Sequence, residues 1–333
     1  SSIEAVKSAK LDLQNLNLDR MGVIIGCGIG GIKTLENEHD IINRKGARRV
    51  SPQFVAKMIP NIAGGHLSMR FGFRGPSQTV ISACASSNDA IGIALRLIRY
   101  GDADVILTGG TEASITPLTI AGFGNMRALS QNCENPTKAS RPFDANRDGF
   151  VLSEGAGMIV LESEKHALDR GAPILAELAG YGSTDDAFHI TQPAPEGEGA
   201  YRAMQIALTD SGLNPKDIDY INAHGTSTPF NDRNESKAIS NLFQENLNEL
   251  NVSSTKSMTG HLLGAAGGIE AIATVKTIMN GIVPPTINYE TPDPECTLNY
   301  TPNKAFETQI NSALSNTFGF GGHNAVLCFR KYN

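Results

Sequence analysis

The sequence predicts an α/β fold made of two related halves. Short β-rich runs alternate with segments of helical periodicity along the 333 residues, which is typical of layered α/β proteins. A faint internal repeat indicates the two halves. Ser82–Ser86 leads into an apolar helix that ends at Gly101, and Ser257–His261 leads into one that ends at Gly281.

Strands are expected where short runs of β-branched and aliphatic residues lie between turn residues, and helices where apolar residues recur every three or four positions. The helix at 86–99 has clear signals at both ends, since Ser86–Asp89 favours a first turn and Gly101 follows the last one. In chain order, the expected strands are 22–26, 79–82, 104–108, 157–161, 218–222, 313–316 and 325–329. The expected helices lie near 53–66, 86–99, 197–212, 231–243 and 262–280.

The internal repeat divides the chain near residues 163–172. The passages Gly155–Leu161 and Gly321–Leu327 also echo each other, and no low-complexity linker separates two domains. We therefore expect a first half at 1–165 and a second half at 166–333.

Composition excludes several classes of protein. Hydrophobic residues make up 40% and charged residues 19% of the chain, which is ordinary for a globular protein. The net charge of −6 argues against nucleic acid or an anionic membrane as a partner. The sequence shows no apolar run long enough to cross a bilayer and no signal-peptide pattern. Its five scattered cysteines lack C-x-x-C spacing, so we expect free thiols in the cytoplasm rather than disulfides or a zinc site.

Cys84 has the setting expected of a nucleophile. It follows a short β-branched strand and stands among small residues at the start of the 86–99 helix. Unpaired N–H groups and the helix dipole at such a position favour a thiolate. The alternative is a buried structural cysteine, which is the commonest fate of a free thiol.

A glycine-rich segment near the start has the pattern of a dinucleotide-binding turn. Gly26–Gly31 follows a strand and matches G-x-G-x-x-G. Such a turn also needs a second strand that ends in an acidic residue about twenty positions later, whereas Asn43–Arg49 is basic and not strand-like. A nicotinamide-dependent dehydrogenase is therefore kept only as the alternative from a different class of enzyme.

Three further segments place histidines among glycines and small polar residues: Asn222–Thr228, Ser254–Glu270 and Asn316–Asn324. Together with Ala83–Ala85, they resemble the elongating β-ketoacyl-acyl-carrier-protein synthases, the type II condensing enzymes of fatty acid synthesis. The resemblance extends over nearly the whole chain. It implies a thiolase-like fold of five layers, α-β-α-β-α, in two pseudo-repeated halves. Because members of the family have a further N-terminal segment with the first core strand, the first half is expected to be truncated at its start.

The resemblance implies a decarboxylative Claisen condensation between an acyl chain, held as a thioester on Cys84, and malonyl-acyl-carrier protein. His224 and His261 would donate hydrogen bonds to the enolate that forms when the malonyl group loses carbon dioxide. Lys256 would order the site and tune its electrostatics.

The same resemblance implies the substrate-binding and supporting roles. The backbone amides of Cys84 and Phe320 would form the oxyanion hole, and Phe320 would gate the passage between the acyl and malonyl steps. Glu270 would support the site, directly or through a bound monovalent cation; in the alternative interpretation it pairs with Lys276 on a helix. No cofactor and no required metal are implied. The remaining expected contacts are Thr226 and Thr228 with the pantetheine arm, Phe318 with substrate, and Ile29 with the end of the acyl pocket.

The expected partners are an acyl carrier protein, bearing acyl and malonyl thioesters, and a second copy of the chain. Arg127 matches the family's carrier-binding arginine, while Arg48 and Arg49 belong to a basic run that also suits an acidic carrier protein. The alternative is a solvated basic loop without a partner. In the dimer, two sheets would join edge to edge at the 79–82 strand, with Ile29 near the shared acyl pocket.

Other condensing enzymes of the same fold stay open as alternatives, namely polyketide synthase-type enzymes and thiolases. A degradative thiolase needs a second catalytic cysteine near the C-terminus, whereas Cys328 lies inside the apolar 325–329 strand. Ala85, Ser87 and Asp89 stand where the family more often has threonine, glycine and histidine, which leaves the preferred acyl chain length open.

Overall fold

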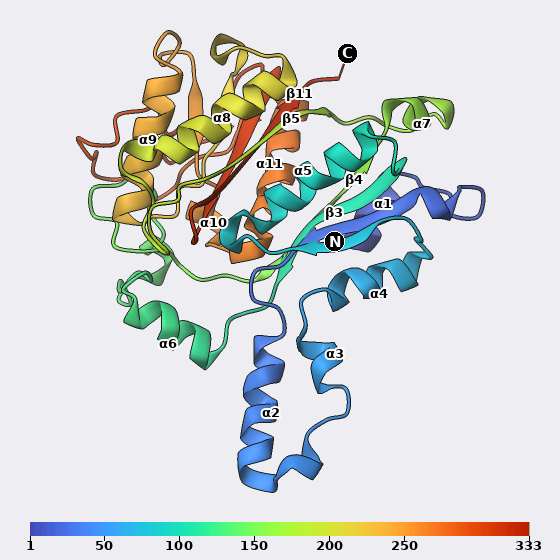
Figure 1. The fold of residues 1–333 in the computed structure, drawn as a ribbon. Helices are drawn as coiled ribbons and strands as arrows, with labels where there is room; N and C mark the ends of the chain where they lie inside the picture. The colour runs from blue at the N-terminus through green and yellow to red at the C-terminus, as the bar shows by residue number, and fades with distance from the viewer. Residues whose placement is uncertain (333) are drawn as a thin grey trace.

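The computed structural model describes residues 1–332 as a layered α/β protein with two central sheets (Figure 1). The first sheet has the strand order β2-β1-β3-β4. In it, β1 pairs in parallel with β2 and β3, and β4 is antiparallel to β3. Its strands are β1 (Met21–Gly26), β2 (Ser77–Val80), β3 (Val105–Glu112) and β4 (Gly155–Glu162).

The second sheet repeats this order and adds a strand, as β7-β6-β10-β11-β5. β6 is parallel to β7 and β10, whereas β11 is antiparallel to β10 and β5. Its strands are β5 (Glu177–Asp185), β6 (Tyr220–Asn222), β7 (Asn251–Ser253), β10 (Ser312–Gly319) and β11 (His323–Arg330). A separate antiparallel pair consists of β8 (Ile282–Val283) and β9 (Phe306–Glu307).

Helices lie between the two sheets and on both outer faces. The central layer is α5 (Ser86–Arg99) and α11 (Ala266–Asn280), where Ile91 of α5 and Ala271 of α11 share a core with β10 and β11. The outer layers are α1 (Ser2–Ser8) and α4 (Ile62–Phe71) on the first sheet, and α8 (Glu198–Ser211) and α9 (Pro229–Leu242) on the second. This is the α-β-α-β-α order that the sequence predicts.

Further helices stand outside these layers: α2 (Ile32–Lys45), α3 (Phe54–Met58), α6 (Pro117–Asn125), α7 (Glu164–Asp169) and α10 (Lys256–Thr259). α2 and α3 form an arm, residues 32–58, that projects from the body in Figure 1 and has no buried residue in either helix. Among residues 1–332, no helix is long and apolar enough to cross a membrane.

All seven expected strands are present, with bounds shifted by a few residues, but β5, β7 and the short strands β8 and β9 are not among the expected ones. β5 escapes the pattern because of its glycines. A Cβ on Gly180 would lie 2.4 Å from the carbonyl oxygen of Ala207, and one on Gly182 would lie 2.0 Å from that of Ala203. These glycines let α8 pack directly on β5, and they also weaken the strand signal.

The expected helix at 53–66 is divided into α3 and α4 at Pro60.

The starts of α5 and α11 share one local structure. Each helix follows a 3₁₀ turn, Ala83–Ala85 or Leu263–Ala265, and the two turns contact each other. The first residue of each turn has a positive φ, 50° at Ala83 and 49° at Leu263. The internal repeat thus places two equivalent helix starts face to face. A division of the halves at residues 165 and 166 stays a prediction.

Candidate active site

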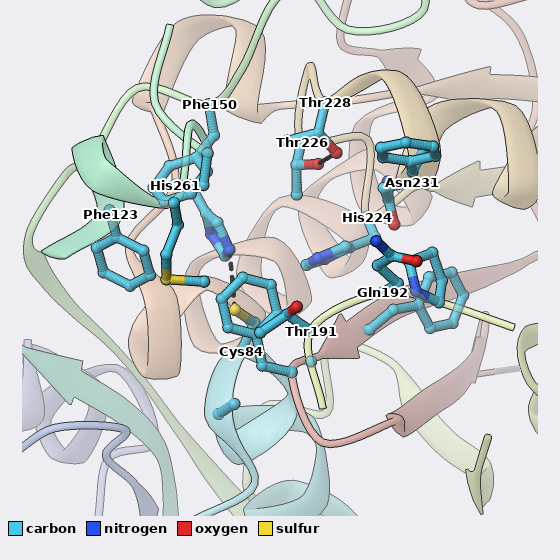
Figure 2. A pocket seen from close by; sticks show the side chains of 18 of the residues that line it. Cys84, Phe123, Phe150, Thr191, Gln192, His224, Thr226, Thr228, Asn231 and His261 are labelled. Carbon is cyan, nitrogen blue, oxygen red and sulfur yellow. Dashed lines mark hydrogen bonds between the residues drawn. The ribbon is translucent and has the colours of Figure 1, made fainter. Parts of the chain in front are cut away.

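A cavity of about 490 Å³ opens where the starts of α5 and α11 meet the ends of β6 and β10. Most of its surface is apolar, and Cys84, His224 and His261 all line it (Figure 2). The fold therefore brings together the three residues that the sequence predicts as the reacting groups.

Cys84 lies in the 3₁₀ turn before α5, as its sequence setting predicts. A Cβ on Gly319 would lie 2.7 Å from the carbonyl oxygen of Ser82 and 3.0 Å from Cys84 N, so glycine is needed for the end of β10 to approach this turn. Burial raises the pKa of the Cys84 thiol to about 12, although the charge of Lys256 and the N–H of Phe320 act in the opposite direction. The helix start favours the thiolate, whereas desolvation of the charged sulfur acts in the opposite direction.

His261 faces Cys84 directly. Its Nε2 lies 3.1 Å from Cys84 Sγ (Figure 2). Its backbone N–H donates to the carbonyl of Val151 at 2.8 Å. The ring of Phe150 packs edge-on against the imidazole, with 5.3 Å between the ring centroids. Burial lowers the pKa of His261 well below its usual value, and the charge of Lys256 lowers it further. His261 is therefore neutral and can accept the thiol proton at Nε2.

His224 follows β6 at the carboxyl end of the second sheet, where open α/β sheets place their ligand sites. Its ring centroid lies 5.3 Å from that of His261, with the rings nearly perpendicular. The N–H groups of His224 and Gly225 both donate to the buried carboxylate of Glu235 at 2.8 Å, which fixes this turn. Lys256 Nζ lies 3.3 Å from His224 Nδ1, which leaves Nε2 as the donor. Burial lowers the pKa of His224 well below its usual value, with the charges of Lys256 and His261 adding to the effect.

Lys256 and Glu270 form a buried ion pair beside the histidines. Lys256 is 1% exposed and Glu270 3% exposed, and Lys256 Nζ donates to Glu270 Oε1. Burial raises the pKa of Glu270, while the charge and the hydrogen bond of Lys256 oppose that rise. The alternative pairing of Glu270 with Lys276 is wrong, because the carboxylate points into the protein rather than along the helix surface.

The other residues predicted to bind substrate line the same cavity; they are Ile29, Thr226, Thr228, Phe318 and Phe320. The hydroxyl oxygens of Thr226 and Thr228 are 2.9 Å apart (Figure 2). Phe318 packs against the His224 ring, whereas Phe320 lies next to Phe123 of α6. Gly321 and Gly322 follow Phe320 with φ angles of 87° and 85°. A segment with that backbone depends on glycine.

The predicted docking arginines lie in two separate places. Arg127 is exposed, follows α6 and borders the cavity. Arg48 and Arg49 are also exposed, but they lie in the 3₁₀ turn of the α2–α3 arm, which projects from the body (Figure 1). Of these three residues, only Arg127 lines the cavity.

Other lining residues have no local signal in the sequence. They come from loops and from the helices α6 and α9, which are far apart in the chain and meet only in the fold. Asp186 joins its own loop to β11, since its carboxylate accepts from Ala194 N of the same loop at 2.8 Å and from Asn324 Nδ2 at 2.7 Å. A pattern of periodicity cannot reveal such contacts. The cavity-lining residues that have no local signal in the sequence include Phe123, Met126, Asp148, Phe150, Asp186, Thr191, Gln192, Pro193 and Asn231.

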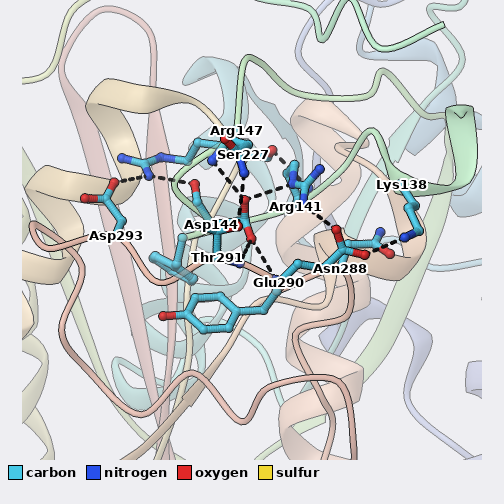
Figure 3. Close-up of polar contacts among 12 residues, drawn as sticks. Lys138, Arg141, Asp144, Arg147, Ser227, Asn288, Glu290, Thr291 and Asp293 are labelled. Carbon is cyan, nitrogen blue, oxygen red and sulfur yellow. Dashed lines mark hydrogen bonds and ion pairs between the residues drawn. The ribbon is translucent and has the colours of Figure 1, made fainter. Parts of the chain in front are cut away.

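A buried ionic network supports the cavity wall formed by the 226–228 turn (Figure 3). Arg147 donates to Asp293 at 2.5 Å and to the carbonyl oxygen of Thr228 at 3.3 Å. The backbone N–H of Arg141 donates to Ser227 Oγ at 3.0 Å. Because these charges are paired and hydrogen-bonded, the cost of burying them is offset and the turn is held in one position.

Comparison with known protein families agrees with this geometry. The model of the β-ketoacyl synthase N-terminal domain matches residues 1–167, and that of the C-terminal domain matches residues 175–290. The chain belongs to the β-ketoacyl synthase family. Within this family, a 3-oxoacyl-[acyl-carrier-protein] synthase 2 of Staphylococcus aureus (strain N315) is 56% identical over 329 residues, which span 99% of this chain and 79% of that protein. The protein of the same name from Synechocystis sp. is 52% identical over 332 residues, spanning 100% of this chain and 80% of that protein.

Solved β-ketoacyl synthase structures share the fold. A β-ketoacyl synthase from Burkholderia phymatum STM815 superposes with a TM-score of 0.90 at 35% identity, over 100% of this chain and 82% of that one. A ketosynthase in complex with its type II polyketide acyl-carrier protein superposes with a TM-score of 0.96 at 37% identity, over 100% of this chain and 83% of that one. The five-layered architecture is thus the thiolase-like fold that the sequence predicts.

Proposed function

We propose that this protein is a 3-oxoacyl-acyl-carrier-protein synthase, which condenses an acyl chain held on Cys84 with malonyl-acyl-carrier protein in fatty acid elongation. The observation that carries the proposal is the 3.1 Å approach of His261 Nε2 to Cys84 Sγ, with His224 in the same cavity. A thiol nucleophile and two neutral imidazoles in a mostly apolar cavity are the groups that this reaction requires.

The first step is transfer of the acyl chain from the carrier's pantetheine thiol to Cys84. The raised pKa keeps the thiol neutral, so it gives its proton to His261 Nε2 as its sulfur attacks the thioester carbonyl. The bond from the acyl carbon to Cys84 sulfur forms, the bond to pantetheine sulfur breaks, and His261 returns the proton to the departing thiolate. The backbone N–H groups of Cys84 and Phe320 stabilise the oxyanion in between.

The second step uses malonyl-carrier protein. Loss of carbon dioxide leaves an enolate, whose oxygen accepts hydrogen bonds from the Nε2–H of His224 and from His261, whose single ring proton moves from Nδ1 to Nε2 by exchange with water once Cys84 is acylated. Both imidazoles have lowered pKa values and act as neutral donors. The enolate carbon then attacks the acyl carbonyl on Cys84. The new C–C bond forms, the C–S bond breaks, and the Cys84 thiolate regains a proton from water.

Lys256 and Glu270 act as supporting residues in this proposal. A monovalent cation is proposed to lie near them, because several buried side-chain oxygen atoms have no protein partner. Ser315 and Asn222, which contribute two of them, are paired on β10 and β6. Neutral oxygens with one carboxylate suit a singly charged cation, which would balance Glu270. The partnerless atoms are Glu270 Oε2, Asn222 Oδ1, Ser315 Oγ and Asn316 Oδ1.

The proposed partners are an acyl carrier protein and a second copy of this chain. Arg127, exposed at the edge of the cavity, suits an acidic carrier protein. β2 is the edge strand of the first sheet, and Ser77 and Gln78 are exposed on it. An unpaired edge of this kind can pair with the same strand of a second copy in an isologous dimer.

The test is reconstitution with purified acyl-carrier and malonyl-carrier proteins. We expect equal amounts of carbon dioxide and 3-oxoacyl-carrier product, and no product from Cys84→Ala. Cys133→Ala is the matched control, since Cys133 is an exposed free thiol, and it should retain activity. Product formation by Cys84→Ala at the wild-type rate would show the proposal to be wrong.

A further inference from the structure

We propose that Asp89 is a positioning residue for Cys84 and acts through Ser82 and Tyr181. This proposal rests on the proposed function, because it concerns the acylation of Cys84. We call the three side chains of Ser82, Asp89 and Tyr181 the Asp89 clamp. They are buried, with exposed fractions of 6%, 8% and 4%.

Asp89 lies in the first turn of α5 and accepts hydrogen bonds from two hydroxyl groups. Ser82 Oγ donates to Oδ2 at 2.5 Å, and Tyr181 OH donates to Oδ1 at 2.5 Å. Ser82 stands two positions before the nucleophile, and Tyr181 belongs to β5 of the second sheet. One carboxylate therefore joins the turn that carries Cys84 to α5 and to the opposite sheet.

Tyr181 reaches Asp89 because α5 has a glycine beneath its ring. A Cβ on Gly92 would lie 2.3 Å from the ring, so any side chain there would displace the tyrosine. The guanidinium of Arg96 lies 4.8 Å from the ring centroid, and Tyr181 N donates to Asp210 at 2.9 Å. The tyrosine is thus held from its backbone to its hydroxyl, which keeps Asp89 in one orientation.

Ser82 connects this contact to the catalytic turn. Its N–H donates to Ser86 Oγ, and its carbonyl accepts from Ala85 N, both at 3.0 Å. The same carbonyl lies against Gly319, where an added Cβ would come within 2.7 Å. Ser82 therefore sets the spacing between the Cys84 turn and the segment that contributes the N–H of Phe320 to the oxyanion hole.

The clamp does not contact the two histidines. His224 is held by Glu235, and His261 is held by Val151. Loss of the clamp should consequently slow attack by Cys84 and spare the decarboxylation of malonyl-carrier protein. A residue with only a structural role would lower both rates together, as folded protein is lost.

The experiment measures two rates in the same protein preparations. The rate of Cys84 acylation is followed in a single turnover by mass spectrometry of the intact protein, and the second rate is carbon dioxide release from malonyl-carrier protein. Asp89→Ala and Tyr181→Phe are expected to slow acylation about tenfold, the effect of losing hydrogen bonds to a charged group. Carbon dioxide release is expected to stay within about twofold of wild type. Asp89→Asn keeps a polar atom for each partner and is expected to recover most of the acylation rate.

Tyr300→Phe is the matched control, because Tyr300 is also buried and its hydroxyl lies 2.8 Å from Ser236 Oγ, outside the clamp. It should acylate at the wild-type rate.

Wild-type acylation in both Asp89→Ala and Tyr181→Phe, or a parallel loss of both rates, would overturn the clamp and leave the proposed function standing. If Asp89→Ala does not fold, Tyr181→Phe decides, since it removes only one oxygen atom. Absence of acylation in the wild-type protein would overturn the proposed function and the clamp with it.

Discussion

The Nε2 atom of His261 lies 3.1 Å from the Sγ atom of Cys84, although 177 positions separate the two residues in the chain. Each residue is held beside one of the two equivalent helix starts, those of α5 and α11. Because its raised pKa keeps the half-buried thiol neutral, it needs a proton acceptor within contact distance. The geometry supplies that acceptor in His261 and leaves His224 to the malonyl step.

Replacement of the two histidines should therefore have different effects. His224→Ala should lose decarboxylation of malonyl-carrier protein by at least about a hundredfold and still acylate Cys84, since removal of one oxyanion donor has an effect of this size. His261→Ala should lose both activities, because it removes the proton acceptor as well as a donor. Separate assays of acylation and carbon dioxide release check this. Equal acylation by the two variants would contradict the role given to His261.

Glu235 should make the stability of the protein depend on pH. Burial raises the pKa of Glu235 to about 7, above its usual value of 4.5, although the N–H groups of Gly225 and His224 lower it. The folded state holds this proton more tightly than the unfolded chain does. Its contribution to stability is thus full below a pH of about 4.5 and is lost as the pH rises through about 7.

Comparison with Glu235→Gln isolates this effect, because glutamine does not titrate. The free energy of unfolding of the wild-type protein should fall, relative to that of the variant, between about pH 5 and about pH 8. Chemical denaturation at several pH values provides the measurement. A difference that stays constant over this range would mean that Glu235 is ionised in both states.

Arg127→Glu should raise the apparent KM for carrier-bound substrate about tenfold, because it replaces attraction to an acidic carrier with repulsion. The effect should weaken at high salt, which screens exposed charges. Activity with a short pantetheine thioester that lacks the carrier should change little. Lys7→Glu is the matched control, because Lys7 is exposed on α1 and does not line the cavity, and it should leave this KM unchanged. If both substrates suffered equally from Arg127→Glu, docking would not be its role.

Local sequence signals account for much of this site. Cys84 is predictable because small and helix-starting residues surround it, and His224 because it follows an apolar strand. Both signals lie within a few residues of the side chain concerned. The family resemblance adds a supporting role for Lys256 and for Glu270, but the ion pair between them becomes visible only in the fold.

Other features depend on contacts between distant segments and leave no local signal. The pKa of Cys84 is raised by loss of solvent around the thiol in the fold, whereas the helix start alone predicts the opposite direction. In the sequence, Glu235 has the pattern of an ordinary helical residue. Its contact with the His224 turn forms only because α9 packs beside that turn in the fold. The glycines that let α8 pack on β5 also weaken its strand pattern. For this reason the sequence predicts neither β5 nor the role of Tyr181 on it.

The most direct test of the central claim is peptide mapping after incubation with an acylated carrier protein. The protein is digested, and each cysteine-containing peptide is weighed by mass spectrometry. We predict a mass gain of one acyl group on the peptide that contains Cys84 and none on those with Cys27, Cys133, Cys296 and Cys328. An acyl group on another cysteine, or no acyl group on Cys84, would contradict the account.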